Sequence, residues 1–141
     1  MTLTSTQGPL DAALTVLNNH LPAGWAATDD PTVEPNTVLV EPVTSPDPES
    51  FTLGGLQERS TILVQVTGHA TSRRRARQAA DAVRTILTGQ TGRKPTNPLT
   101  LTSHVFDPVR SLGDLRLGLD KGIHRFTETY RITWQTTPES S

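Results

Sequence analysis

A strict alternation near the end of the chain, in residues 124–134, constrains the fold most. The even positions carry three aromatic rings, an isoleucine, a histidine and a glutamate, whereas the odd positions hold only arginine and threonine. Successive side chains of a β-strand point to opposite faces of a sheet, so this period of two predicts a strand with one buried face. One apolar and one polar face is typical of antiparallel sheets. We therefore expect an antiparallel sheet whose second face is open to solvent or to a partner.

A second alternating segment, residues 61–67, predicts another strand. Ile62, Val64 and Val66 fall on one face, and the intervening positions hold threonine, leucine and glutamine. Three shorter strands are expected at residues 25–28, 37–41 and 100–106 because their side chains favour strands and turn-forming residues flank them.

Two further segments have the spacing of amphipathic helices. Apolar residues recur at steps of three and four from Leu10 to Leu21, which predicts a first helix of about three turns that follows Gly8-Pro9. A second helix is predicted between a cap at residue 71 or 72 and a stop at residue 89. Its narrow inward face consists of small or aliphatic residues, namely Ala76, Ala79, Ala80, Val83 and Leu87.

These elements follow one another in the order α-β-β-β-α-β-β. The order predicts an α+β fold, a mostly antiparallel β-sheet with two helices packed on one face. The length of 141 residues suits a single domain, residues 1–141. Two segments, residues 42–59 and 107–122, are rich in proline, glycine and aspartate, and we expect them to be long loops.

Composition limits the classes of function. Thirteen lysine and arginine residues against fourteen acidic residues leave a net charge of −1, so the chain as a whole does not attract nucleic acid or an anionic membrane. No apolar run approaches the roughly 20 residues that a membrane span requires, and the N-terminus does not have a signal-peptide pattern. The sequence contains no cysteine, which excludes a thiolate nucleophile and the usual cysteine zinc sites.

The histidines have no spacing that binds a metal, and no Gly-x-Ser-x-Gly motif marks a nucleophile. The glycines and cations of residues 89–94 differ from a phosphate-binding loop, because a helix precedes them and a proline follows the lysine. A small enzyme would have to use His69, His104, Asp107 or Glu128, and nothing in the pattern favours that reading. We therefore predict no enzymatic activity, no cofactor and no metal.

The main charge cluster is the run of arginines at residues 73–77. At helical spacing, Arg73, Arg74, Arg77 and Arg84 share one side of the second helix, which we expect to face solvent. Three readings stay open: a solvated helix face, a protein contact, and a contact with DNA.

The last strand holds the other candidate residues. Arg125 and Arg131 fall on its polar face, whereas Glu128 falls on the apolar face between Phe126 and Tyr130. A buried carboxylate without a partner is costly, so either an arginine or hydroxyl partner satisfies it or this part of the face is an intersubunit surface. The candidate interface residues are therefore Arg73, Arg74, Arg77, Arg84, Arg125, Arg131 and Glu128.

Two stretches carry a resemblance to a known family. Residues 68–84 read GHATSRRRARQAADAVR, a strand end leading into a helix rich in alanine and arginine, and residues 125–130 read RFTETY, the start of an aromatic strand. The chain from Thr61 onward resembles the tail terminator, or tail completion, proteins of long-tailed, siphovirus-type phages. It departs from them just before the aromatic strand, where Ile123-His124 stands in place of the usual proline.

The resemblance implies a structural virion protein. Such subunits form a hexameric ring that caps the tail tube and docks to the head connector during head-tail joining. The implied partners are other copies of the chain, the major tail tube protein, a head-closure or connector protein, and DNA passing through the ring. The implied location is the neck of the virion, and the host cytoplasm during assembly. Two alternatives are another neck protein, a head-closure or stopper subunit, and a small nucleic-acid-binding module that uses the Arg73–Arg77 cluster.

Overall fold

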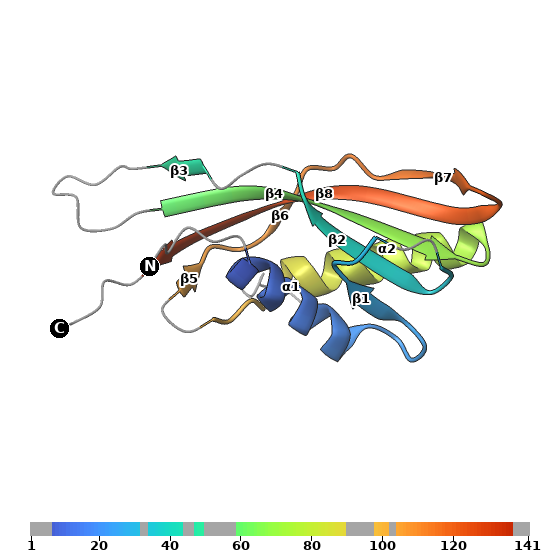
Figure 1. Ribbon diagram of the computed structural model, residues 1–141, viewed down its shortest axis with the longest axis horizontal. Helices are drawn as coiled ribbons and strands as arrows, with labels where there is room; N and C mark the ends of the chain where they lie inside the picture. Colours follow the sequence, from blue (N-terminus) through green and yellow to red (C-terminus); the bar gives the residue numbers. More distant parts are fainter. Residues whose placement is uncertain are drawn as a thin grey trace, which may run out of the picture.

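The computed structural model describes residues 7–31, 34–43, 47–49, 59–89, 98–101 and 104–136. This part of the chain forms two helices and one sheet (Figure 1). The helices are α1 (Gln7–His20) and α2 (Arg73–Thr88). The strands are β1 (Ala26–Thr28), β2 (Thr37–Pro42), β3 (Asp47–Glu49), β4 (Arg59–Ala70), β5 (His104–Phe106), β6 (Arg110–Ser111), β7 (Arg116–Asp120) and β8 (Ile123–Thr136). The predicted α+β fold is confirmed.

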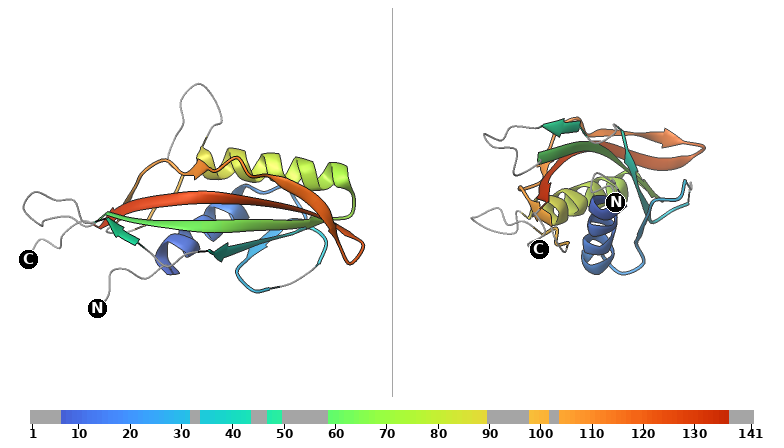
Figure 2. Two further views of the ribbon diagram at one scale, coloured as in Figure 1. Left: turned by 90° about the horizontal axis from the view of Figure 1, so that it is seen from above. Right: turned by 60° about the vertical axis from the view of Figure 1, so that its left-hand side comes forward.

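The sheet is built around two long strands. Its main order is β1-β2-β4-β8-β5, with β3 paired to β4 and with β6 and β7 paired to β8. All these pairings are antiparallel except that of β1 with β2. Figure 2 shows the sheet curling over the two helices, which lie on the same side of it.

The register places the apolar positions of both long strands on the covered face. Ile62 lies opposite Ile132 and Val64 opposite Tyr130, so the even positions of β4 and β8 share one side. Trp134, at the end of the series, is completely buried. The sequence predicted this burial, because residues two positions apart in a strand lie on the same face, and the two preceding even positions of β8, Tyr130 and Ile132, are aromatic or aliphatic.

Helix α2 begins and ends where the sequence predicts. The Ser72 hydroxyl accepts a hydrogen bond from the backbone N–H of Arg75 at 3.2 Å, and Gly89 closes the helix with a φ of 67°. Only glycine adopts that left-handed conformation without cost. Ala76, Ala79 and Ala80 are buried against the sheet, and their small size lets the helix backbone lie close.

Two element boundaries differ from the predictions. Helix α1 begins at Gln7, so Gly8 and Pro9 lie in its first turn rather than before it. A proline is tolerated there because the first N–H groups of a helix have no partner within it. The strand expected at residues 100–106 is shorter: β5 begins at His104, and Leu101 forms only an isolated bridge.

The prediction of a long loop at residues 107–122 is wrong. This segment contains β6 and β7, which both pair with β8, and a tight turn at Lys121-Gly122 closes the β7–β8 hairpin. Both turn residues have a positive φ, 52° and 81°, which is the pattern of a two-residue hairpin turn. The segment lacks strand-favouring residues because pairing with β8, and not local propensity, makes it extended.

The second expected loop, residues 42–59, is also interrupted. Strand β3 lies within it and pairs with the beginning of β4. Residues 44–46 and 50–58 lie outside the described part of the chain, so the prediction stays open there.

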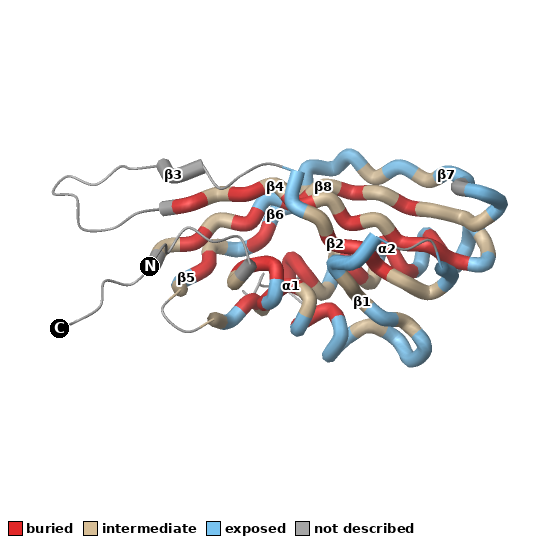
Figure 3. Tube along the Cα trace, in the orientation of Figure 1, coloured by how far each residue is buried: buried red, intermediate tan, exposed pale blue. Residues whose placement is uncertain are grey.

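The face of the sheet opposite the helices carries the odd positions of β4 and β8. Buried and half-buried residues alternate along both strands in Figure 3. Arg131 on this face is exposed and Arg125 is half-buried, as expected from their positions. The register adds Arg110 opposite Arg131, and Arg116 opposite Thr127, to the same face. This uncovered face is therefore rich in arginine and threonine.

The pairing of Gly68 with Phe126 gives a test of the core register. A methyl group on Gly68 would overlap the ring of Phe126, which lies directly opposite on β8. We expect Gly68→Ala to lower the free energy of unfolding in urea by about 1–3 kcal/mol, because the site has no room. Adding Phe126→Leu should relieve the overlap. The double variant should therefore lose less free energy of unfolding than the sum of the losses of the two single variants.

Gly118→Ala is the matched control for this test. A methyl group at Gly118, on β7, would contact only the Arg125 guanidinium at 3.9 Å. Its stability should change by no more than about 0.5 kcal/mol. Equal effects of the two substitutions would show that Gly68 does not lie under the Phe126 ring.

Candidate functional site

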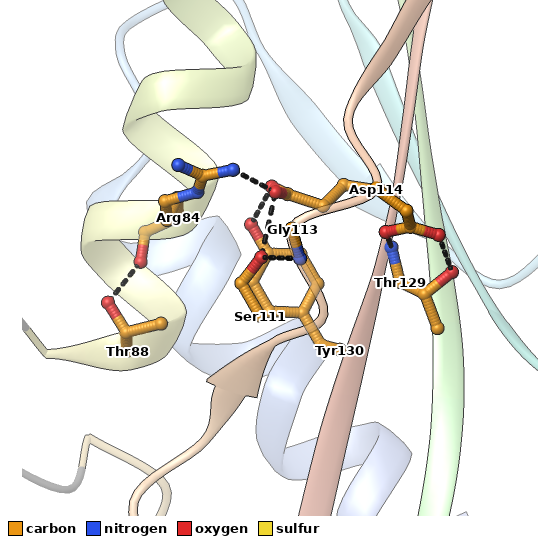
Figure 4. Close-up of polar contacts among 8 residues, drawn as sticks. Arg84, Thr88, Ser111, Gly113, Asp114, Thr129 and Tyr130 are labelled. Carbon is orange, nitrogen blue, oxygen red and sulfur yellow. Dashed lines mark hydrogen bonds and ion pairs between the residues drawn. The ribbon is translucent and has the colours of Figure 1, made fainter.

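Glu128 is the centre of a polar cluster on the covered face of the sheet. It lies in β8 and its side chain is 1% exposed. Tyr130 donates its hydroxyl to Oε1 at 2.6 Å, and Ser111 donates to Oε2 at 2.8 Å. The Arg84 guanidinium forms an ion pair with Oε2. Figure 4 shows these three side chains converging on the carboxylate from α2, β6 and β8.

The fold dictates this convergence. Tyr130 is two residues beyond Glu128 in the same strand, so both side chains point under the helices. Ser111 lies opposite Tyr130 in the β6–β8 register and therefore faces the same way. Arg84 is one helical turn beyond Ala80, which is buried against the sheet. The two carboxylate oxygens thus receive three donors from three elements.

The cluster fixes the charge state of the carboxyl group. Burial by itself raises the pKa of Glu128, but the hydrogen bonds from Arg84, Tyr130 and Ser111 and the Arg84 charge lower it below its usual value. Burial and the neighbouring carboxylate raise the pKa of Tyr130, so its hydroxyl remains a donor. Hydrogen bonding to Glu128 raises the pKa of Arg84. The pair is therefore ionised on both sides near neutral pH.

The expectation that Arg84 faces solvent with the other arginines holds only in part, because its side chain is 42% exposed while its guanidinium pairs with the buried Glu128 carboxylate. Its guanidinium turns toward the sheet because the buried carboxylate provides a fixed opposite charge. Of the alternatives left open for Glu128, an arginine partner together with hydroxyl partners is the one observed. The sequence indicated that Glu128 needs a partner, but it contained no signal for Ser111, which lies in a segment read as a loop.

A second carboxylate, that of Asp114, fixes the connection between β6 and β7 against β8. Asp114 accepts hydrogen bonds from the Thr129 backbone N–H at 2.8 Å and from its hydroxyl at 2.7 Å. Burial raises the pKa of Asp114, but these bonds and the Arg116 charge lower it below its usual value. The carboxylate takes the place of a ladder carbonyl where the strand is broken. Ser111 further accepts from the Gly113 N–H at 3.0 Å, so residues 111–114 are held against β8 from both ends.

The cluster has the chemistry of a structural tie. Both oxygens of Glu128 are occupied, and the pKa shift keeps the carboxylate ionised, which suits neither a general acid nor a proton shuttle near pH 7. The described residues contain no group of three or more histidine, aspartate or glutamate side chains that could hold a metal ion. Arg84 is 42% exposed and lines a shallow hollow of about 560 Å³ with Arg110 and Val109. The outer side of the tie is thus cationic.

The seven candidate interface residues fall into three separate places. Arg84 and Glu128 form the tie, in which the carboxylate is buried and the guanidinium is partly exposed. Arg73, Arg74 and Arg77 lie exposed in the first turns of α2, and Arg125 and Arg131 lie on the uncovered face of the sheet. The structure therefore does not gather the arginines into one site, although Arg73 and Arg125 both line one hollow between the start of α2 and the β7–β8 hairpin.

The sequence matches no known family model, and comparison with curated proteins gives no significant match. Within the described ranges, neither helix is long and apolar enough to cross a membrane.

The tie predicts acid sensitivity of the fold. Because the pKa of Glu128 is lower in the folded chain than its usual 4.5, the carboxylate contributes fully above pH 4.5 and loses its contribution as pH falls through the folded-state pKa. Glu128→Gln should cost about 1–3 kcal/mol at pH 7 and flatten the fall in stability below pH 4.5. Urea unfolding at pH 3–7 measures both effects.

Asp81→Asn is the control for this prediction. Asp81 is exposed on α2 and makes no hydrogen bond or ion pair with another described residue outside the helix backbone. This variant should keep the pH profile of the unmodified chain. Profiles of equal slope for Glu128→Gln and the unmodified chain would show that the tie does not govern acid unfolding.

Proposed function

We propose that this chain is a structural subunit of a phage neck, which assembles as a ring, caps the tail tube and offers a docking surface to the head connector. The observation that carries the proposal is the one-sided sheet. Both helices cover one face, while the other face exposes a polar surface of threonine and arginine to a neighbour. The resemblance from Thr61 onward to tail terminator proteins supports the same role.

The polar cluster supports a structural rather than a catalytic role. It ties α2, β6 and β8 together through Glu128, which strengthens the edge of the sheet without offering a reactive group. The partners of the proposed ring are copies of this chain, the major tail tube protein and a head-closure or connector protein, with DNA passing through the opening. The location is the virion neck, after assembly in the host cytoplasm. A head-closure or stopper subunit is the competing assignment within the neck.

The first test is the assembly state of the purified protein. Sedimentation should show a species of about six times the 15.3 kDa chain mass, and electron microscopy should show closed rings with a central opening. Purified tail tubes should bind these rings at one end. Rings that bind connectors but no tubes would favour the stopper assignment, and a chain that forms no ring and binds neither would contradict the neck role.

A nucleic-acid-binding module is the second candidate. Four arginines, at residues 73, 74, 75 and 77, are exposed in the first turns of α2. The helix dipole disfavours cations at this end, and none of the four forms an ion pair with another described residue. A nearby phosphate would compensate for both.

The double variant Arg74→Gln, Arg77→Gln tests this second candidate. If the cluster binds DNA, the variant should be retained less on immobilised duplex DNA, and its salt dependence should weaken by about 0.9 in the log–log slope for each lost phosphate contact. Arg131→Gln, on the other side of the sheet, is the control. Unchanged retention of the double variant excludes the cluster as a DNA contact.

A further inference from the structure

The charges of this chain are divided along its sequence. Residues 1–58 contain no lysine or arginine. They contain eight acidic residues: Asp11, Asp29, Asp30, Glu34, Glu41, Asp47, Glu49 and Glu58. The remaining residues carry all thirteen cations against six acids. A net charge near zero therefore hides two oppositely charged parts.

The fold turns this division into a polarity across the sheet. The acidic part supplies β1 and β2, which form one edge, whereas the cationic part supplies β8 and the strands β6 and β7 at the other edge. In Figure 1 the blue and cyan strands lie on one side of the central pair, and the orange strand β7 lies on the other.

The acidic side chains lie in the connection between β1 and β2, of which residues 29–31 and 34–36 are described. Asp29, Asp30 and Glu34 are all exposed there, and none forms an ion pair with another described residue. We call these three residues the acidic edge.

The cationic edge lies at the β7–β8 hairpin and the start of α2. Arg116, Lys121 and Arg73 are exposed, and none forms an ion pair within the described ranges. Asp114 is the acid nearest to Arg116 in the sequence. Its carboxylate accepts hydrogen bonds from Thr129, and the Arg116 charge acts on it without forming an ion pair. We call Arg73, Arg116 and Lys121 the cationic edge.

The two edges lie at the same level of the sheet. Thr37, which follows the acidic connection, pairs with His69; His69 pairs with Arg125, and Arg125 with Gly118 of β7. Four strand spacings separate β1 from β7, which is about 19 Å. For Arg116 and Lys121 this path along the sheet exceeds the screening length of about 8 Å at physiological salt. None of the three cations forms an ion pair with the three residues of the acidic edge.

We propose that the acidic edge of one copy docks against the cationic edge of the next copy. Symmetric pairing through either edge would place like charges together. Head-to-tail pairing places opposite charges together and leaves the pair with one free acidic edge and one free cationic edge, so further copies can add until a ring closes. This contact rests on the proposed ring, for which it supplies the repeating interface.

An apolar hollow beside the cationic edge fits the same contact. It has a volume of about 220 Å³, and its lining includes Leu117, Leu119 and Ala76 together with Arg73 and Arg125. Leu119 is 64% exposed, the largest exposure among the large apolar side chains of the described chain. A docked neighbour covers it and excludes water from the ion pairs around it.

Charge reversal tests the contact. The first variant carries Asp29→Lys, Asp30→Lys and Glu34→Lys, and the second carries Arg73→Glu, Arg116→Glu and Lys121→Glu. A third chain carries all six changes and has inverted but complementary edges. Asp81→Lys, an exposed change on α2, is the control. Circular dichroism confirms folding, and sedimentation at 50 and 500 mM salt measures association.

We expect the association of the unmodified chain to weaken as the salt concentration rises. Each triple variant should associate at least about tenfold more weakly, while the sixfold variant and an equal mixture of the two triple variants should recover. The control should behave as the unmodified chain does. The contact would be overturned if the sixfold variant associates no more strongly than the triple variants. It would also be overturned if the unmodified chain stays monomeric and the second variant differs from it only in weaker retention on DNA.

The outcomes separate this contact from the neck function. Rings that bind tail tubes and form equally well in every variant would leave the neck function in place and overturn the contact. Charge-reversible association into open chains that bind neither tubes nor connectors would support the contact and contradict the neck function.

Discussion

The pairing of β4 with β8 is the constraint on which the rest of the structure depends. It runs from Arg59 opposite Gln135 to Ala70 opposite His124, and every other strand is added to one of its two sides. The pairing brings two alternating patterns into phase, so that one face becomes continuously apolar. Both helices pack there, because only that face offers apolar surface, and the other face stays available for contacts.

Glu128 interrupts the apolar row of even positions in β8, and the polar cluster forms around it. A charged residue in an apolar row is tolerated only with partners, and these come from α2, from β6 and from β8 itself. The tie therefore joins the helix layer to the weak end of the sheet, where β6 has only two residues. Without the charge, so short a strand would be held only by its pairing with β8 and by the Asp114 bonds to Thr129.

The sequence predicted the elements that have local signals, and it missed the features that depend on contacts with distant residues. The period of two in β8 and the caps of α2 at Ser72 and Gly89 are local signals, and they were sufficient for the fold class. Strand β7 reads as a loop because Gly118 and Asp120 are poor strand residues, and only β8 makes the segment extended. For the same reason Arg84 was identified as a candidate but placed in solvent, since its orientation depends on a residue 44 positions away.

The length of the β4–β8 pairing has a mechanical consequence. Antiparallel ladder hydrogen bonds run perpendicular to the strands, so a pull along the strand direction loads all of them together instead of one after another. Twelve residue pairs share such a load here, and the buried side chains of Ile62, Tyr130 and Trp134 must slide past their neighbours before the pair can separate. The molecule is therefore stiffest along its longest axis, the direction in which β4 and β8 run.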